Sequence, residues 1–220
     1  SFPTRRSSDL DDTRIVWIAN PNNPTGTFLP YDELKAFIAS LPRDIVVVLD
    51  EAYNEYLAPA HRVDTTEWLK EFDHLVITRT FSKIYGMAGL RIGYALASAA
   101  VADLMNRVRQ PFNCNNLALA GAIAALEDAE FLAQSFELNQ AGMQQINAGL
   151  DALGLKYLPS HANFATFHVA DAAGVNQRLL KQGVIVRPLA GYAMHDWLRV
   201  TIGTQAENAR FLEALKVALV

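Results

Sequence analysis

The feature that most constrains the fold is a repeated alternation of short apolar runs with polar or helical segments between residues 14 and 97. The run Ile45-Val-Val-Val-Leu49 reads as a buried strand, because apolar residues follow one another without interruption. Three further apolar runs predict strands, at Ile15–Ala19, Leu75–Thr78 and Arg91–Ala97. Strands that alternate with helices indicate βαβ units, so we expect an α/β fold built on a mostly parallel sheet.

One connection in this region is too short for a parallel crossover. Only about a dozen residues join the third and fourth strands, whereas a parallel crossover needs about that many plus a helix. The fourth strand is therefore expected to be antiparallel. Its start would then share a sheet edge with the ends of its parallel neighbours. The polar residues expected to meet on this edge are Asn23, Asp50, Lys83 and Arg91.

The remaining chain predicts helices and then a smaller α/β region. Four apolar residues at helical spacing indicate a helix between the first two strands: Leu34, Phe37, Ile38 and Leu41. Residues 99–150 read as helical with a polar break at residues 113–116, and a boundary is expected near residues 149–154. Beyond it we expect strands near Asn163–His168, Val184–Arg187 and Trp197–Thr201, with helices near Ala173–Gln182 and Ala206–Leu219.

Composition excludes several classes of protein. Hydrophobic residues make up 51% of the 220 residues, enough for a core. The net charge of −4 makes nucleic acid and anionic membranes poor partners, and charges interrupt every candidate membrane span. The single cysteine, Cys114, excludes an internal disulfide and fits a reducing cytoplasm. No cluster of residues has the spacing of metal ligands.

The most informative motif for chemistry is the run from Arg79 to Arg91. It places Lys83 beside the hydroxyls of Thr80 and Ser82, with a glycine-containing turn and Arg91 behind it. Hydroxyls and a guanidinium suit a phosphate, and a lysine amine with a lowered pKa suits an aldehyde. Pyridoxal 5'-phosphate (PLP) carries both groups. The alternative is an ordinary strand-to-turn segment with a surface lysine.

Two further segments follow predicted strands. Asn20-Pro-Asn-Asn-Pro-Thr-Gly26 must form a loop, and it could present Asn23 as a rigid amide donor or be a simple turn. Asp50-Glu51-Ala52-Tyr53 starts where a buried strand ends, which is where open α/β sheets place their ligands. Asp50 could instead only cap the next segment.

In this order the three segments resemble the fold type I PLP-dependent aminotransferases of class I/II. The signatures are Asn-Pro-Thr-Gly, Asp-Glu-Ala-Tyr, and Ser-Lys with an arginine eight residues later. The stretches Gly183–Tyr192 and Leu198–Thr204 are most similar to histidinol-phosphate aminotransferases, and the similarity runs from about Thr13 to Val220. The resemblance implies a three-layer α/β/α large domain, of which the chain holds part, and a small C-terminal α/β domain.

The resemblance also implies the chemical roles of the residues around the ring. Lys83 would hold the cofactor's aldehyde and, once freed, act as the base that moves the substrate proton. Asp50 would pair with the pyridinium nitrogen and so make the ring an electron sink. Tyr53 and Asn23 would hydrogen-bond the phenolic oxygen. Ala52 would lie against the ring face, where a larger side chain would clash.

Five further residues would bind anions. Thr80, Ser82 and Arg91 would hold the cofactor phosphate. Arg199 would bind the anionic group of the substrate, which is a phosphate in histidinol phosphate. Arg187 would add a second positive charge, because two arginines suit a dianion better than one does.

The implied reaction is amino transfer between histidinol phosphate or imidazole-acetol phosphate and glutamate or 2-oxoglutarate, in histidine biosynthesis. Aromatic amino acid transamination and decarboxylation of a phosphorylated amino acid remain alternatives on the same fold. A non-catalytic effector-sensing domain is a third, against which the intact lysine, aspartate and arginine set argues. Family members are homodimers, so we expect a cytoplasmic homodimer.

The expected organisation has three parts. Residues 1–12 do not match the family and are expected to be a tail or a non-native segment. Residues 13–150 would form the C-terminal part of the PLP-binding large domain with an interdomain helix, and residues 151–220 the small domain. Because the similarity begins well inside the family pattern, the chain is expected to be truncated at its N-terminus. It would be inactive alone if the missing part is essential.

Overall fold

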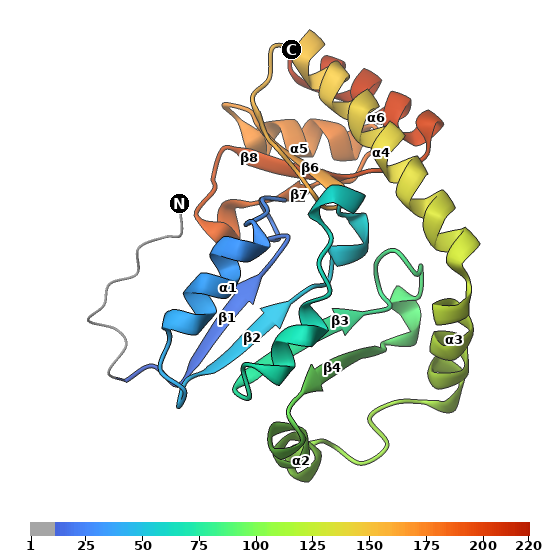
Figure 1. Ribbon diagram of the computed structural model, residues 1–220. Coiled ribbons are helices and arrows are strands. Elements are labelled where there is room, and N and C mark those ends of the chain that lie inside the picture. The colour runs from blue at the N-terminus through green and yellow to red at the C-terminus, as the bar shows by residue number, and fades with distance from the viewer. Residues whose placement is uncertain (1–11) are drawn as a thin grey trace. The chain divides into compact units, whose positions relative to one another are not determined.

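The computed structural model describes residues 12–220 (Figure 1). The predicted tail, residues 1–12, lies outside the described part except for Asp12. The chain divides into two compact units. The first comprises the described residues up to Asn20 with Leu29–Ala52 and His61–Ile123, and the second comprises Pro21–Phe28, Tyr53–Ala60 and Ala124–Val220. The division into domains at residue 150 stays a prediction, since these units are defined by compactness alone.

The first unit contains a four-stranded sheet in the order β1-β2-β3-β4, whose strands lie side by side in Figure 1. The strands are β1 (Ile15–Ala19), β2 (Val46–Asp50), β3 (Leu75–Thr80) and β4 (Gly93–Ala97). The first three are parallel, and β4 runs antiparallel to β3, as the short connection predicted. Asp50 is the last residue of β2 rather than the first beyond it. Arg91 lies two residues before β4, so the predicted strand start was too early.

Hydrophobic burial explains why these strands and their first helix form. Val47, Leu49, Leu75 and Ile77 are fully or almost fully buried. The predicted helix is α1 (Tyr31–Ser40), which buries Leu34 and Ile38 of its predicted apolar stripe, whereas Phe37 is half-buried and Leu41 follows the helix as its C-cap. The other helices of this part of the chain are α2 (Ala99–Val108), α3 (Asn116–Glu127) and the 3₁₀ helices η4 (Thr65–Lys70) and η5 (Ala88–Leu90). Within residues 12–220 no helix has both the length and the apolar character that crossing a bilayer requires.

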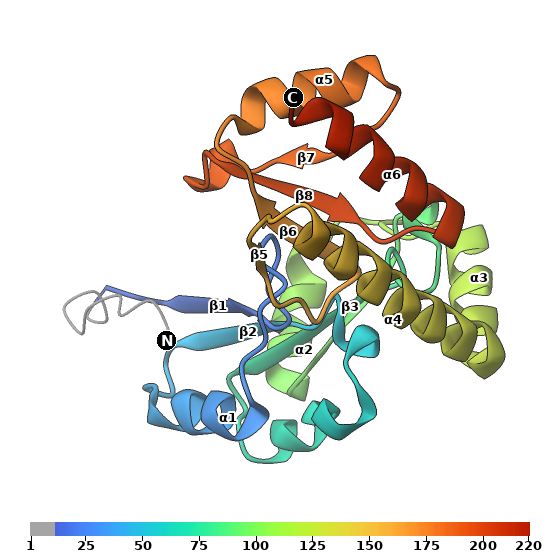
Figure 2. The ribbon, with the colours of Figure 1, turned by 90° about the horizontal axis from the view of Figure 1, so that it is seen from above.

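The second unit contains an antiparallel sheet in the order β5-β6-β8-β7. Its strands are β5 (Tyr157–Leu158), β6 (Phe164–His168), β7 (Arg187–Pro188) and β8 (Trp197–Thr201). Its helices are α4 (Ala129–Ala152), α5 (Ala172–Lys181), α6 (Gln205–Ala218) and the 3₁₀ helices η2 (Asn54–Tyr56) and η6 (Ala190–Tyr192), and η3 (Pro59–His61) begins within this unit. Figure 2 shows α5 and α6 alongside the strands β7 and β8.

The two faces of this sheet differ in character because successive side chains of a strand point to opposite sides. Ala165 and Phe167 of β6, with Leu198 and Val200 of β8, belong to one buried apolar cluster with residues of α4, α5 and α6. The opposite face carries the polar and aromatic residues of β6, β7 and β8. The residues on that face include Phe164, Thr166, Arg187 and Arg199.

Two predictions about this region were inexact. The predicted strand from Val184 shrinks to Arg187–Pro188, because the amide of Val184 donates instead to the carbonyl of Leu179 and so ends α5. The long predicted helix divides into α3 and α4 at Asp128, whose carboxylate accepts a hydrogen bond from the Phe131 amide at 2.9 Å. A short polar residue that caps a helix thus ends one helix and starts the next.

Candidate functional site

Three of the predicted site residues lie at one end of the first sheet. Asp50 ends β2, the Lys83 loop follows β3, and Arg91 precedes β4. Because β2 and β3 are parallel and β4 is antiparallel, these positions all belong to the edge formed by the carboxyl ends of the parallel strands. The predicted convergence is therefore found for these three residues. Asn23 follows β1 but belongs to the second unit.

The Lys83 loop is closed by backbone hydrogen bonds and anchored by apolar side chains. Phe81 donates its amide to the Ile92 carbonyl at 3.2 Å, and its own carbonyl accepts from the Met87 amide at 3.0 Å. The Lys83 carbonyl accepts from the amide of Gly86, whose φ of 70° favours a glycine. Phe81 and Ile84 are 3% exposed each. Lys83 itself is half-buried between these two anchors.

The predicted phosphate ligands surround the start of this loop. Thr80 Oγ1 accepts from the amide of Ser82 at 3.0 Å, which shapes the turn out of β3. Arg91 has a left-handed backbone with φ of 53°, and its guanidinium donates to the Ala88 carbonyl at 2.7 Å. Opposite Thr80 stands Gly93, where an added Cβ would come within 2.7 Å of the Arg79 carbonyl oxygen. The glycine thus allows β4 to approach β3 closely beside the predicted phosphate ligands, which form the candidate phosphate cradle: Thr80, Ser82 and Arg91.

Asp50 is held by the turn that follows it. One of its carboxylate oxygens accepts from the Ala52 amide at 3.1 Å. Among the described residues, the other oxygen has no hydrogen-bond partner. The half-buried carboxylate is therefore fixed in direction and still has one oxygen available for a ligand.

Glu51 was part of a predicted motif but was given no role. Its side chain is fully buried, and Arg79 contacts it through Nε at 2.9 Å and Nη2 at 2.8 Å. Burial raises the pKa of Glu51, although Arg79 opposes the shift. Burial would lower the pKa of Arg79, but the Glu51 carboxylate outweighs it and raises that pKa. Burial thus decides the pKa of Glu51, whereas the ion pair decides the pKa of Arg79. The reason is that the Arg79 side chain keeps 18% exposure and so loses less hydration.

Within the second unit, Asn23, Tyr53 and Arg199 form a hydrogen-bonded chain. The Asn23 amide nitrogen donates to Tyr53 Oη at 3.4 Å, and its oxygen accepts from Arg199 Nη1. Tyr53 is 5% exposed and packs edge-on against Phe164, with the ring centroids 5.4 Å apart. The Arg199 guanidinium lies over the same ring, 4.7 Å from its centroid. One buried phenylalanine therefore supports both a predicted cofactor residue and a predicted substrate residue.

The loop that carries Asn23 is fixed to β6 and to the segment before it. Thr166 Oγ1 donates to the Pro24 carbonyl at 2.6 Å, and the His161 amide donates to the Gly26 carbonyl at 2.8 Å. Gly26 has φ of 75°, and an added Cβ would come within 2.2 Å of Ser160 Oγ. No other residue type fits there without displacing Ser160.

Arg187 and Arg199 are direct cross-strand neighbours in the pairing of β7 with β8. They therefore lie on the same face of the sheet, the face that also carries Phe164. Arg187 is exposed, and Arg199 is half-buried with its Nε unpartnered. Like charges directly opposite each other are unfavourable, so this arrangement creates a place where an anion would be stabilised.

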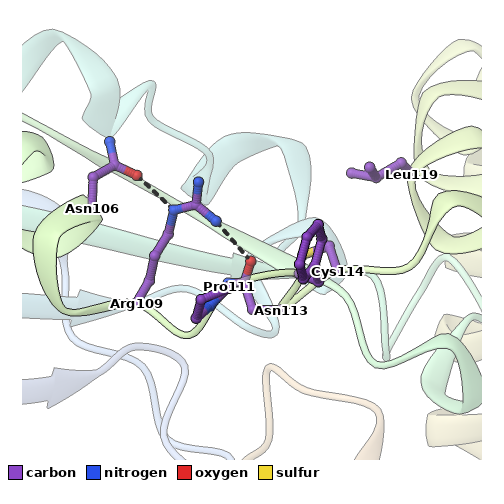
Figure 3. A pocket seen from close by; sticks show the side chains of 7 residues that line it. Asn106, Arg109, Pro111, Asn113, Cys114 and Leu119 are labelled. Carbon is purple, nitrogen blue, oxygen red and sulfur yellow. Dashed lines mark hydrogen bonds between the residues drawn. The ribbon is translucent and has the colours of Figure 1, made fainter.

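A separate surface hollow of about 610 Å³ lies near the connection between α2 and α3 (Figure 3). Arg109 reaches into it and already donates to Asn106 at 3.0 Å and to Asn113 at 3.2 Å. No residue predicted to bind cofactor or substrate lines this hollow. Across residues 12–220, no group of three or more histidine, cysteine or acidic side chains could hold a metal ion.

Comparison with known protein families decides the class of protein. The family described as aminotransferase class I and II matches residues 5–215, so the match extends into residues 1–12, which were expected to lie outside the family. This chain belongs to the class I and II aminotransferases. Histidinol-phosphate aminotransferase 1 of Dechloromonas aromatica is 68% identical over 214 residues, which cover 97% of this chain and 59% of that protein. Histidinol-phosphate aminotransferase of Methylobacillus flagellatus is 61% identical over 209 residues, 95% of this chain and 56% of that protein.

Solved structures share the fold of this aminotransferase chain. Histidinol-phosphate aminotransferase of Sinorhizobium meliloti, in complex with pyridoxal-5'-phosphate, is 32% identical with a TM-score of 0.86, over 93% of this chain and 57% of that one. L-threonine-O-3-phosphate decarboxylase of Porphyromonas gingivalis is 25% identical with a TM-score of 0.85, over 99% and 69%. The predicted fold type I class is confirmed. The chain spans less than two thirds of the length of the curated relatives that it matches.

Proposed function

We propose that the protein containing this chain catalyses PLP-dependent amino transfer between histidinol phosphate or imidazole-acetol phosphate and glutamate or 2-oxoglutarate. The observation that carries the proposal is the combination, at one sheet end, of Asp50, the Lys83 loop and Arg91. Relatives at 68% and 61% identity are named histidinol-phosphate aminotransferases, which supports this substrate pair.

The residues at this sheet end fit PLP. Thr80, Ser82 and Arg91 offer two hydroxyls and a guanidinium to a phosphate. Asp50 has an oxygen free to accept from a ring nitrogen, and its other oxygen is fixed by the Ala52 amide. Lys83 extends from a loop that its buried neighbours hold in place. When bound, PLP withdraws electrons from the carbon that bears the amino group, which allows that carbon to lose a proton.

Each side chain then has a task that its surroundings support. The Asp50 carboxylate would hold a proton on the pyridine nitrogen, and the freed Lys83 amine would act as the base that moves the substrate proton. Tyr53 Oη accepts from the Asn23 amide at 3.4 Å, and the Tyr53 hydroxyl is assigned to hydrogen-bond the phenolic oxygen of the ring. Ala52 offers a small side chain where the ring face would lie.

The two cross-strand arginines are assigned to the substrate. Arg199 can contribute its unpartnered Nε and Arg187 its exposed guanidinium to one anion. Two guanidiniums suit the dianionic phosphate of histidinol phosphate, whereas an α-carboxylate carries one charge. Aromatic amino acid transamination would use the same arginines for a carboxylate, so the ratio of the two activities distinguishes these substrates.

A second candidate function is decarboxylation of a phosphorylated amino acid. The similar fold of the Porphyromonas gingivalis L-threonine-O-3-phosphate decarboxylase favours it. With a phosphorylated amino acid as substrate, the products separate the two reactions: transamination would form a keto acid, whereas decarboxylation would release carbon dioxide.

We also propose that the protein works as a homodimer in the cytoplasm. The family resemblance supports the dimer, and the single cysteine is compatible with a reducing compartment. Sedimentation at several protein concentrations tests the dimer, and fractionation of cells tests the location.

The deciding experiment is a visible absorption spectrum of the protein with PLP, beside a Lys83→Ala control. We expect a visible band that depends on Lys83 and bleaches when glutamate is added. Arg199→Lys keeps one charge but loses the planar guanidinium. It should therefore weaken the binding of phosphate substrates and leave the absorption band intact. A band that persists in Lys83→Ala, or that glutamate leaves unchanged, would refute the assignment.

A further inference from the structure

Glu51 has a complete set of partners, although it lies beside the candidate site rather than in it. Both Arg79 contacts, at 2.9 and 2.8 Å, reach the same oxygen, Oε2. The other oxygen, Oε1, accepts from Thr65 Oγ1 at 2.8 Å and from Tyr31 Oη at 3.4 Å. Thr65 is itself fully buried. Such a network fixes the carboxylate in a single direction.

The ion pair connects β2 and β3 at the point where the pairing of these two strands ends. The register of β2 with β3 ends at Asp50 opposite Thr78, and the Glu51 amide donates to the Thr78 carbonyl at 2.9 Å. Beyond that bond, the ion pair of Glu51 with Arg79 also connects the two strands.

Neighbouring positions on these strands carry the candidate site. Asp50 directly precedes Glu51, and Thr80 directly follows Arg79. Because adjacent side chains of a strand point to opposite faces, the ion pair lies on one face and Asp50 and Thr80 belong to the other. The pair is therefore placed to hold these two residues without occupying the space that a ligand needs.

Stability alone does not account for this ion pair. Removing two charges from water costs about as much as their attraction returns, so a buried pair contributes little net stability. In agreement, burial raises the pKa of Glu51 even though Arg79 stands beside it. What a fully bonded buried pair does supply is a single geometry.

We propose that Glu51 and Arg79 are positioning residues, which fix the separation between Asp50 and the Thr80–Lys83 loop. The inference rests on the proposed function, since that separation matters for a ligand with a ring nitrogen at one end and a phosphate at the other. A ligand that touches both ends requires the correct spacing, whereas a ligand that touches only the phosphate cradle does not.

The test uses two probes on the whole protein: 4-deoxypyridoxine 5'-phosphate, which has a methyl group in place of the PLP aldehyde, and inorganic phosphate. Glu51→Gln keeps the contacts to Thr65 and Tyr31 but removes the charge. We expect it to weaken the ring-containing probe about 10-fold, the effect of about 1.4 kcal/mol, and to change phosphate affinity less than about twofold. Arg79→Lys keeps a charge at this place and should show the same pattern with a smaller loss.

A matched control is the half-exposed ion pair of Lys35 with Glu71, at 2.6 Å in the same unit. Lys35→Gln should change neither affinity. Equal losses of both probes in Glu51→Gln would mean that the cradle itself is damaged, which overturns the positioning role. Unchanged affinity for both probes also overturns it. If Glu51→Gln does not fold, Arg79→Lys decides by the same criteria. A wild type that binds neither PLP nor the analogue refutes the proposed function, and this inference with it.

Discussion

Replacing Thr166 by valine tests whether one buried hydrogen bond holds the Asn23 loop. Thr166 is fully buried, and its hydroxyl donates to the carbonyl of buried Pro24 at 2.6 Å. Valine has almost the same shape and the same β-branch, so packing is kept while the donor is lost. The change therefore isolates the hydrogen bond from the filling of the core.

The magnitude follows from what the Pro24 carbonyl loses. A hydrogen bond of this kind contributes about 1 kcal/mol net, and an acceptor left buried without a partner costs about 1–3 kcal/mol. Because Pro24 is buried, the second effect should dominate, and we expect Thr166→Val to cost about 2 kcal/mol. For a chain of this size that lowers the melting temperature by about 4–8 °C.

Thermal melting followed by circular dichroism measures the effect, without added cofactor because a ligand would itself raise the midpoint. Thr201→Val is the matched control, because Thr201 is an exposed threonine on the neighbouring strand β8 and on the same face. The control should change stability by less than about 0.5 kcal/mol. If both variants melt together with the wild type, water reaches the Pro24 carbonyl and the argument from burial is wrong.

Three other predictions follow from the described residues. Gly26→Ala should destabilise the protein by more than about 1 kcal/mol, because φ is 75° and the new Cβ would meet Ser160 Oγ at 2.2 Å; Ser160→Gly in the same chain should recover part of the loss in urea unfolding. Burial raises the pKa of Glu51, so the folded state binds the carboxyl proton more tightly than the unfolded state does. The stability of the wild type relative to Glu51→Gln should therefore be greatest below pH 4.5 and fall as the pH rises through the raised pKa. A stability difference that grows with pH would contradict this. Burial, with Glu55 adding to it, raises the pKa of Tyr56 from 10.0 to about 12, so its contribution is complete below pH 10 and lost as the pH rises toward 12; Tyr56→Phe should remove that loss in alkaline unfolding curves.

The sequence predicted the local elements well where hydrophobic pattern decides them. The continuous apolar run before Asp50 and the helical spacing of Leu34 and Ile38 each depend on neighbours a few residues away. The antiparallel direction of β4 also followed from the length of the connection between β3 and β4, because so short a connection cannot form a parallel crossover. The motifs predicted Lys83, Asp50 and Arg91 as site residues, and the structure places all three at one end of the first sheet.

Two glycines in α4 illustrate what the pattern of one helix does not explain. Gly142 and Gly149 lie inside this helix, which ends at Ala152, within the boundary region expected at residues 149–154. An added Cβ would come within 2.4 Å of Ile202 at Gly142 and within 2.4 Å of Leu212 at Gly149. The helix keeps these glycines because α6 and the end of β8 approach its backbone closely, which no feature of the helix's own sequence records.

Tertiary structure alone decided which polar groups became partners. Arg187 pairs across strands with Arg199, Glu51 is bonded to Arg79, and Asn23 connects Tyr53 to Arg199. The sequence by itself determined the family, the strands and the residue types available for chemistry, since these depend on composition and local spacing. Contacts between residues far apart in the chain depend on strand register and on packing. That is why the buried ion pair beside Asp50 emerged only from the folded structure.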